Sequence, residues 1–156
     1  MAKIFSVNGG RVIVFADPML TRHSEYRLGD PRRPHDVALL SPILARWGLE
    51  LEMDTSQGDE ERVVDAFGMS VPVRISGTFA ARDAGGEAEC TLSDTRLMAR
   101  CTIGKGGALL IADAAILDED DEHAGPHAED KASAEHSEHR IREAALTGLL
   151  ESGFEG

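Results

Sequence analysis

The chain of 156 residues has few aromatic side chains and no long apolar run. It contains one Trp, one Tyr and five Phe, and 42% of its residues are hydrophobic. This length and content predict a single domain over residues 1–156 with an aliphatic core. No segment approaches the roughly 18 consecutive apolar residues of a transmembrane helix. We therefore expect no direct insertion of this chain into a membrane.

Basic residues are also scarce relative to acidic ones. The chain has 16 Lys and Arg against 28 Asp and Glu, which gives a formal net charge of −12. Nucleic-acid binding needs clustered cations that neutralise phosphates, and attachment to anionic lipid needs the same. The charge therefore argues against nucleic acid as a partner and against electrostatic binding to a membrane surface.

Cysteine is nearly absent, because Cys90 and Cys101 are the only two. Two are too few for a disulfide scaffold or for a zinc site on their own. They flank residues 95–96 symmetrically, which is typical of facing positions in a hairpin. In an oxidising compartment they would form a disulfide, whereas in the cytosol they would be small buried side chains. Neither lies in the sharp exposed turn that suits a catalytic thiol.

Recognised catalytic motifs are missing as well. The sequence has no Gly-x-Ser-x-Gly, no HExxH and no dinucleotide-binding fingerprint. The glycine-rich segment 104–107 lacks the spacing of a phosphate-binding loop and precedes an apolar run rather than a helix. We interpret it as a tight turn into a strand. The sequence thus predicts no enzyme activity and no cofactor.

Two apolar runs, each preceded by a glycine pair, stand out. Each run continues with mostly apolar residues and ends in Ala-Asp; the two segments are Gly9–Asp17 and Gly106–Asp113. Continuous apolar runs of this length are typical of strands that are buried on both faces, as in parallel sheets covered by helices. We therefore expect two buried strands of one sheet.

The segment after the first run predicts a crossover. A long polar loop over residues 19–34 leads to a helix that begins at Asp36, or at Ser41 as N-cap with Pro42 in the first turn, and ends at Gly48. Residues 49–53 alternate between apolar and acidic, which indicates a strand with one exposed face. Residues 11–53 therefore predict a β-loop-α-β unit with parallel strands.

The rest of the sequence has two further parts, which differ in residue pattern. Short runs between residues 62 and 103 predict an antiparallel insertion, most clearly a hairpin over 88–103. Residues 118–136 form an expected acidic, histidine-rich loop, followed by a C-terminal helix over about 137–151 that starts near Ser133 or Ser137. Helical spacing predicts that its buried side is formed by Ile141, Ala144, Ala145, Leu149 and Leu150.

Carboxylates at the ends of the two main strands are the first candidate ligands. Ligands of open α/β sheets bind at the carboxyl ends of strands, where Asp17 and Asp113 would hold a cation or polarise a water. The alternative is that each Asp accepts hydrogen bonds from the turn that follows it. Arg22, His23 and Arg27 lie in the loop after the first strand and would face an anionic ligand or pair with acids of the same chain.

Histidines near the C-terminus are a second candidate. His136 and His139 are three residues apart and would share one face of a helix, which suits a transition metal. The alternative is a solvated, charged surface.

Three segments together resemble a known family. They are Gly9–Pro18, the run 42–49 that closes in Trp47-Gly48, and the glycine turn and strand 103–113. In this order they resemble the auxiliary extracytoplasmic component of uncharacterised gliding-motility-type ABC transport systems, whose domain is similar to class I glutamine amidotransferases. The resemblance spans about residues 8–117. It implies an α/β, partial flavodoxin-like three-layer domain with a short parallel sheet, an antiparallel β insertion and a C-terminal helix.

The same resemblance implies a function. It indicates a non-catalytic accessory or binding module beside the permease and ATPase subunits of an ABC transporter, at the extracytoplasmic face of a bacterial membrane; otherwise the chain is cytoplasmic. The cysteine nucleophile of the amidotransferases has no counterpart here. The chain looks like the C-terminal half of the family domain, which would leave a strand edge open for homo-oligomers. The alternative function is a small-ligand or metal-binding domain, or a degenerate amidotransferase-like enzyme.

Overall fold

The computed structural model describes residues 9–18, 40–53, 56–58, 60–82, 87–117 and 132–154. It is a mixed α/β structure built on a four-stranded sheet in the order β1-β8-β7-β6, with two further two-stranded sheets, β2-β5 and β3-β4. The strands are β1 (Arg11–Phe15), β2 (Leu49–Met53), β3 (Arg62–Ala66), β4 (Met69–Val73), β5 (Gly77–Ala81), β6 (Glu89–Leu92), β7 (Met98–Ile103) and β8 (Gly106–Ile111). The helices are α2 (Ser41–Arg46), the short 3-10 helix η2 (Ala115–Leu117) and α3 (Ala132–Phe154).

The two glycine-led runs are neighbouring strands, as expected. β1 and β8 pair in parallel, in a register from Arg11 opposite Gly107 to Phe15 opposite Ile111. Residues 108–111 of β8 are buried, and β7 and β1 flank that strand within the sheet. β1 is an edge strand of its sheet and is only half-buried, with Arg11 exposed. The expectation that both strands are fully buried is therefore wrong for β1.

The predicted parallel crossover is also wrong. β2 pairs with β5, antiparallel, from Leu49 opposite Ala81 to Met53 opposite Gly77. Gly77 provides a physical reason, since a Cβ at this position would lie 2.8 Å from the Leu51 side chain and 2.9 Å from the Glu52 carbonyl oxygen. The missing side chain lets β2 approach β5 closely. The alternation of buried and exposed residues along β2 agrees with the sequence prediction.

Tight turns set the register of the hairpins. β3 and β4 are joined by Phe67-Gly68, which have φ of 50° and 78°, as a two-residue hairpin loop with two positive φ angles requires. β7 and β8 are joined by Gly104-Lys105, with φ of 60° at Gly104. The predicted hairpin over 88–103 is β6-β7, in which Cys90 faces Cys101. This hairpin belongs to the main sheet rather than to a separate insertion.

The helices differ from expectation mainly at their ends. α2 begins at Ser41 with Pro42 in its first turn, so Leu40 rather than Ser41 is the N-cap residue. Gly48, with φ of 75°, follows the helix end as predicted. The alternative start at Asp36 lies outside the described residues. α3 begins at Ala132, so residues 132–136 belong to the helix and not to the preceding loop.

The buried side of α3 is only partly the predicted one. Ala145 and Leu149 are buried, whereas Ala144 is exposed and Leu150 is 53% exposed. Arg142 is buried in their place, with 8% of its surface exposed. A polar residue on the inner side of the helix was not expected, and its partner is described below.

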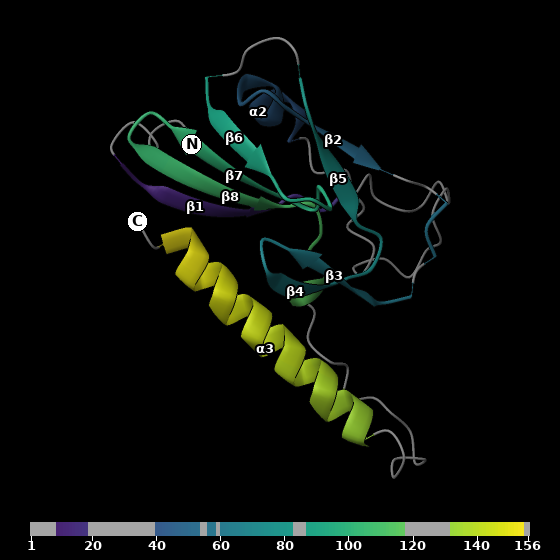
Figure 1. Cartoon of the computed structure of the whole chain (residues 1–156). Coiled ribbons are helices and arrows are strands. Elements are labelled where there is room, and N and C mark those ends of the chain that lie inside the picture. Colours follow the sequence, from purple (N-terminus) through teal and green to yellow (C-terminus); the bar gives the residue numbers. More distant parts are fainter. Residues whose placement is uncertain are drawn as a thin grey trace, which may run out of the picture.

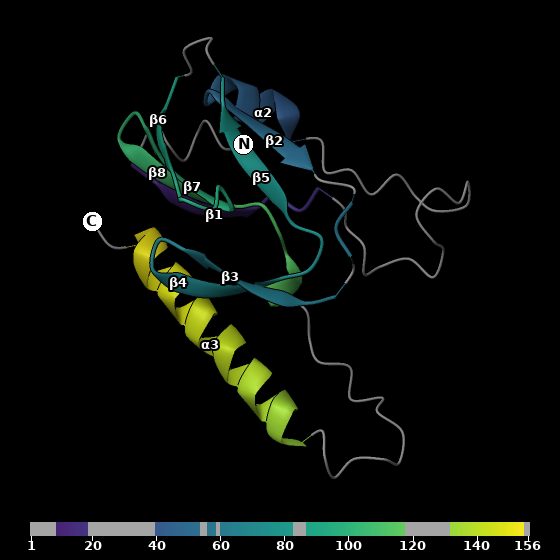
Figure 2. The same ribbon diagram turned by 45° about the vertical axis from the view of Figure 1, so that its right-hand side comes forward.

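The layers are arranged around the four-stranded sheet. In Figures 1 and 2, α2 and the β2-β5 pair lie over one face, while α3 and the β3-β4 hairpin lie over the other. Contacts agree with this arrangement: the Trp47 carbonyl oxygen lies 3.5 Å from Cys90 Sγ, and a Cβ on Gly153 would lie 3.0 Å from Ile13. Neither α2 nor α3, as far as the chain is described, has the length and apolar character needed to cross a membrane.

Candidate functional site

The carboxyl ends of β1 and β8 bring the two predicted aspartates to the same end of the sheet. Asp17 and Asp113 each follow, by two residues, the paired residues Phe15 and Ile111. Asp17 is half-buried, whereas only 4% of the Asp113 surface is exposed. The parallel pairing therefore accounts for their position at one end of the sheet.

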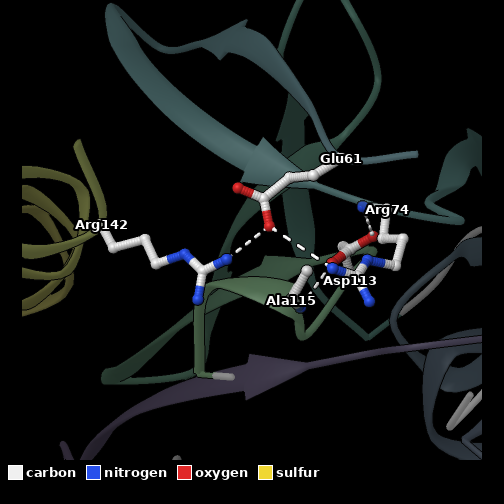
Figure 3. Close-up of polar contacts among 5 residues, drawn as sticks. All are labelled: Glu61, Arg74, Asp113, Ala115 and Arg142. Atoms are coloured by element: carbon white, nitrogen blue, oxygen red, sulfur yellow. Dashed lines mark hydrogen bonds and ion pairs between the residues drawn. The ribbon is translucent and has the colours of Figure 1, made fainter. Parts of the chain in front are cut away.

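The Asp113 carboxylate accepts two hydrogen bonds from backbone amides. The Arg74 backbone N–H donates to Oδ2 over 3.1 Å, and the Ala115 N–H donates to Oδ1. Figure 3 shows the carboxylate between these donors. Bonds of this kind stabilise the ionised carboxylate and fix its orientation. Asp113 thus holds the start of η2 against the end of β4, in agreement with the turn-acceptor alternative.

Three further charged residues surround this position. Glu61, just before β3, forms an ion pair with Arg142 of α3, and its Oε2 lies 3.9 Å from Arg74 Nη2. Figure 3 shows Glu61 between the two arginines. We call Glu61, Arg74, Asp113 and Arg142 the polar cluster. It fastens the inner side of α3 to the β3-β4 hairpin and to the end of β8.

The serine beside the polar cluster is also engaged. The Ser76 hydroxyl accepts a hydrogen bond from Arg62 Nη2 over 2.9 Å, and the Ser76 carbonyl accepts one from Gln57 Nε2 over 2.9 Å. A nucleophilic serine needs a neighbouring base that removes its proton. A guanidinium cannot do this, so the arrangement is that of a structural serine.

Cys90 and Cys101 are joined by a disulfide between β6 and β7. Because they face each other in the pairing of these strands, the bond fastens the edge strand β6 to the centre of the sheet. The equal spacing of the two cysteines from residues 95–96 predicted that they would face each other in a hairpin. It left the redox state open.

The other predicted site residues are not assembled into a site that can be described. Arg22, His23 and Arg27 lie outside the described residues. His136 and His139 are both in α3, but only His139 has a described side chain, which is exposed with Nε2 3.7 Å from Glu143 Oε1. Over the described parts of the chain, no group of three or more His, Cys, Asp or Glu could hold a metal ion.

The opposite end of the sheet carries a cavity of about 420 Å³. It lies where the β7-β8 turn and the start of β1 approach the end of α3 (Figure 1). Three cations contribute to its lining, and none of the described lining residues is acidic. The lining consists of Arg11, Arg100–Thr102, Gly104–Leu109, Ser152 and Gly153. Segment 104–107 forms the tight turn into β8, as the sequence predicts. The sequence did not predict that a cavity lies beside this turn.

Comparisons with protein-family models, with curated proteins and with solved structures gave no match to this chain.

Proposed function

We propose that the protein is a non-catalytic accessory or binding module of an ABC-type transport system. The observation that carries the non-catalytic part is the double backbone hydrogen bond to Asp113. A general base must offer a lone pair to its substrate. Here main-chain amides of the same chain hold both carboxylate oxygens in place and use one lone pair of each, which favours a structural role. The transport context rests on the family resemblance.

Two features support the domain type and the compartment that this proposal needs. The parallel β1-β8 pair, with α2 near one face of the sheet and α3 on the other, is compatible with a partial flavodoxin-like three-layer domain. The Cys90–Cys101 disulfide is typical of proteins that work in oxidising compartments. The disulfide supports a location at the extracytoplasmic face of a bacterial membrane.

Co-purification tests the transport context. We expect the affinity-tagged full chain, expressed in its native cells and cross-linked before membrane extraction, to enrich one ABC permease together with its ATPase. A tagged variant with Leu44 and Leu49 both replaced by Asp, which removes two fully buried core side chains, serves as the unfolded control. Recovery of the native chain without either subunit would contradict the transport role. Neighbouring reading frames that encode a permease and an ATPase would support it.

Thiol titration tests the compartment. In protein prepared from native cells without reductant and then denatured, we expect no reactive thiol from Cys90 or Cys101. Two reactive thiols per chain would contradict an extracytoplasmic location and favour the cytosolic alternative.

The runner-up is a small-ligand or metal-binding domain, or a degenerate amidotransferase-like enzyme. The observation that favours ligand binding is the cavity at the end of the sheet that carries the glycine-rich turn of segment 104–107, which we call the glycine-turn end. For the enzyme alternative, the test is hydrolysis of small amides and esters by the native chain and by Asp17→Asn and Asp113→Asn. Turnover that disappears in either variant would overturn the non-catalytic proposal.

Self-association is a further part of the proposal. Among the described residues β1 pairs only with β8, so its other edge has backbone groups that suit a second strand. Sedimentation velocity over a wide range of protein concentration measures this. A monomer at every concentration would exclude pairing of β1 edges.

A further inference from the structure

The cavity at the glycine-turn end has an ordered floor. Arg11, Gly107 and Thr102 face one another across β1, β8 and β7, because Gly107 pairs with Arg11 on one side and with Thr102 on the other. Paired residues project to the same face of a sheet. The next row is Ile13, Leu109 and Arg100, and a Cβ on Gly153 of α3 would lie 3.0 Å from Ile13. The floor is therefore on the face covered by α3.

Gly107 opens this floor. It stands between Arg11 and Thr102 without a side chain, and among the described residues a Cβ at this position would meet only the Cys101 carbonyl oxygen, at 3.7 Å. That is an ordinary contact, so the backbone does not require glycine here for lack of room. The missing side chain leaves space between a guanidinium and a hydroxyl.

Arg100 is held in position at the side of the cavity. Its Nη2 donates to Ser152 Oγ of α3, and its guanidinium carbon lies 4.8 Å from the centroid of the Phe67 ring. A guanidinium has five N–H donors in a fixed plane, and the Ser152 bond uses one of them. A donor that is already oriented loses less entropy when it binds a ligand.

The third cation, Lys105, is exposed at the tip of the turn beside the cavity. The closest acid by strand pairing is Glu89, which faces Thr102 from β6 but does not line the cavity. Three cations thus converge on one cavity of a chain whose net charge is −12. Such a site attracts small anions.

We infer that this cavity binds a small dianionic oxyanion ligand, through Arg11, Arg100 and Lys105 with the hydroxyls of Thr102 and Ser152. The ligand is a phosphate ester or a dicarboxylate, because both present oxygens that match the planar N–H donors of arginine. A volume of about 420 Å³ suits a metabolite-sized molecule rather than a polymer. The inference does not depend on the transport role and holds for any cellular context.

A purely structural explanation is available for the same cations. The end of a helix carries partial negative charge, which cations stabilise, and Ser152 and Gly153 are near the end of α3. In that case the cations would affect the stability of the helix end and no anion would bind. The experiment has to separate these two explanations.

Calorimetric titration of the full chain with inorganic phosphate and with succinate makes the separation, with acetate as the monoanion control. We expect saturable binding of at least one dianion, weaker at higher ionic strength because salt screens the attraction. Gly107→Val fills the floor and should abolish binding. Lys105→Gln, at the exposed turn, should weaken it about tenfold, the effect of one lost charge-assisted hydrogen bond. Glu89→Gln should strengthen it.

Matched variants guard against indirect effects. Gly58→Val makes the same change where an added Cβ meets none of the described residues within 4 Å, and Arg82→Gln removes an exposed cation that does not line the cavity. Both should bind like the native chain. The inference is overturned by native protein that binds neither dianion, or by binding that Gly107→Val and Lys105→Gln leave unchanged. If Gly107→Val does not fold, as judged by circular dichroism, Lys105→Gln and Glu89→Gln still decide.

Discussion

The two ends of the four-stranded sheet are both rich in charged side chains, but the charges are arranged differently. At the Asp113 end, the acids of the polar cluster face backbone amides and arginines at hydrogen-bonding or ion-pairing distance. At the glycine-turn end, the described lining of the cavity is basic and includes no acid. Opposite charges that face one another stabilise a fold, whereas charges of one sign around a cavity are suited to a ligand. Variants at each end can test this contrast.

The largest expected effect is at the polar cluster. Replacement of Arg142 by Met leaves Glu61, whose side chain is only 20% exposed, without its closest cation. Breaking a buried ion pair from one side typically costs about 3–5 kcal/mol of unfolding free energy. Urea denaturation measures the loss, and Arg140→Met, exposed on the same helix, is the matched control. The double variant Glu61→Leu, Arg142→Met should recover most of the loss, and a loss that persists would contradict the ion-pair account.

A smaller loss is expected from Asp113→Ala. The variant removes both acceptors and leaves the backbone amides of Arg74 and Ala115 without them. Each unsatisfied buried amide costs about 1–3 kcal/mol, so we expect about 3 kcal/mol in total. Asp94→Ala, at the exposed tip of the β6-β7 hairpin, should cost less than about 0.5 kcal/mol. Equal stability of the two variants would show that Asp113 has no structural role and would reopen its chemical one.

Reduction of the disulfide should have the next largest effect. The bond closes a loop between residues 11 positions apart, and loops of this size correspond to about 2–3 kcal/mol in the chain-entropy account. We expect Cys90→Ala, Cys101→Ala to unfold at lower urea concentration by this amount, and native protein in dithiothreitol to shift similarly. A double variant as stable as the oxidised protein would contradict the role of the bond in holding β6.

The smallest effect on stability is expected at the glycine-turn end. Lys105→Gln should change the unfolding free energy by less than about 0.5 kcal/mol, because an exposed turn residue contributes little packing. The same variant should lose anion affinity, as described above. If the variant loses stability but keeps its anion affinity, the role of Lys105 is to stabilise the end of α3 and not to bind a ligand.

Part of the candidate site followed from local patterns. Parallel pairing places Asp17 and Asp113 at the same end of the sheet, because both follow strands that run in the same direction. The facing cysteines were found because a hairpin pairs residues symmetrically about its turn. Arg142 was missed, because helical spacing selects apolar residues for the buried side and does not show that Glu61, 81 residues away, supplies a partner.

What the sequence determined by itself was local. Glycine pairs with aliphatic runs defined β1 and β8, turn residues defined the hairpins, and Pro42 with Gly48 bounded α2, since each depends on conformational preferences of neighbouring residues. The tertiary structure decided which strand β2 joins, which side of α3 is buried and where a cavity forms. These depend on contacts between distant segments, such as the close approach at Gly77 and the meeting of Ser152 with Arg100. The conformational preference of a short segment does not predict such contacts, because burial and strand pairing depend on residues that are distant in the sequence.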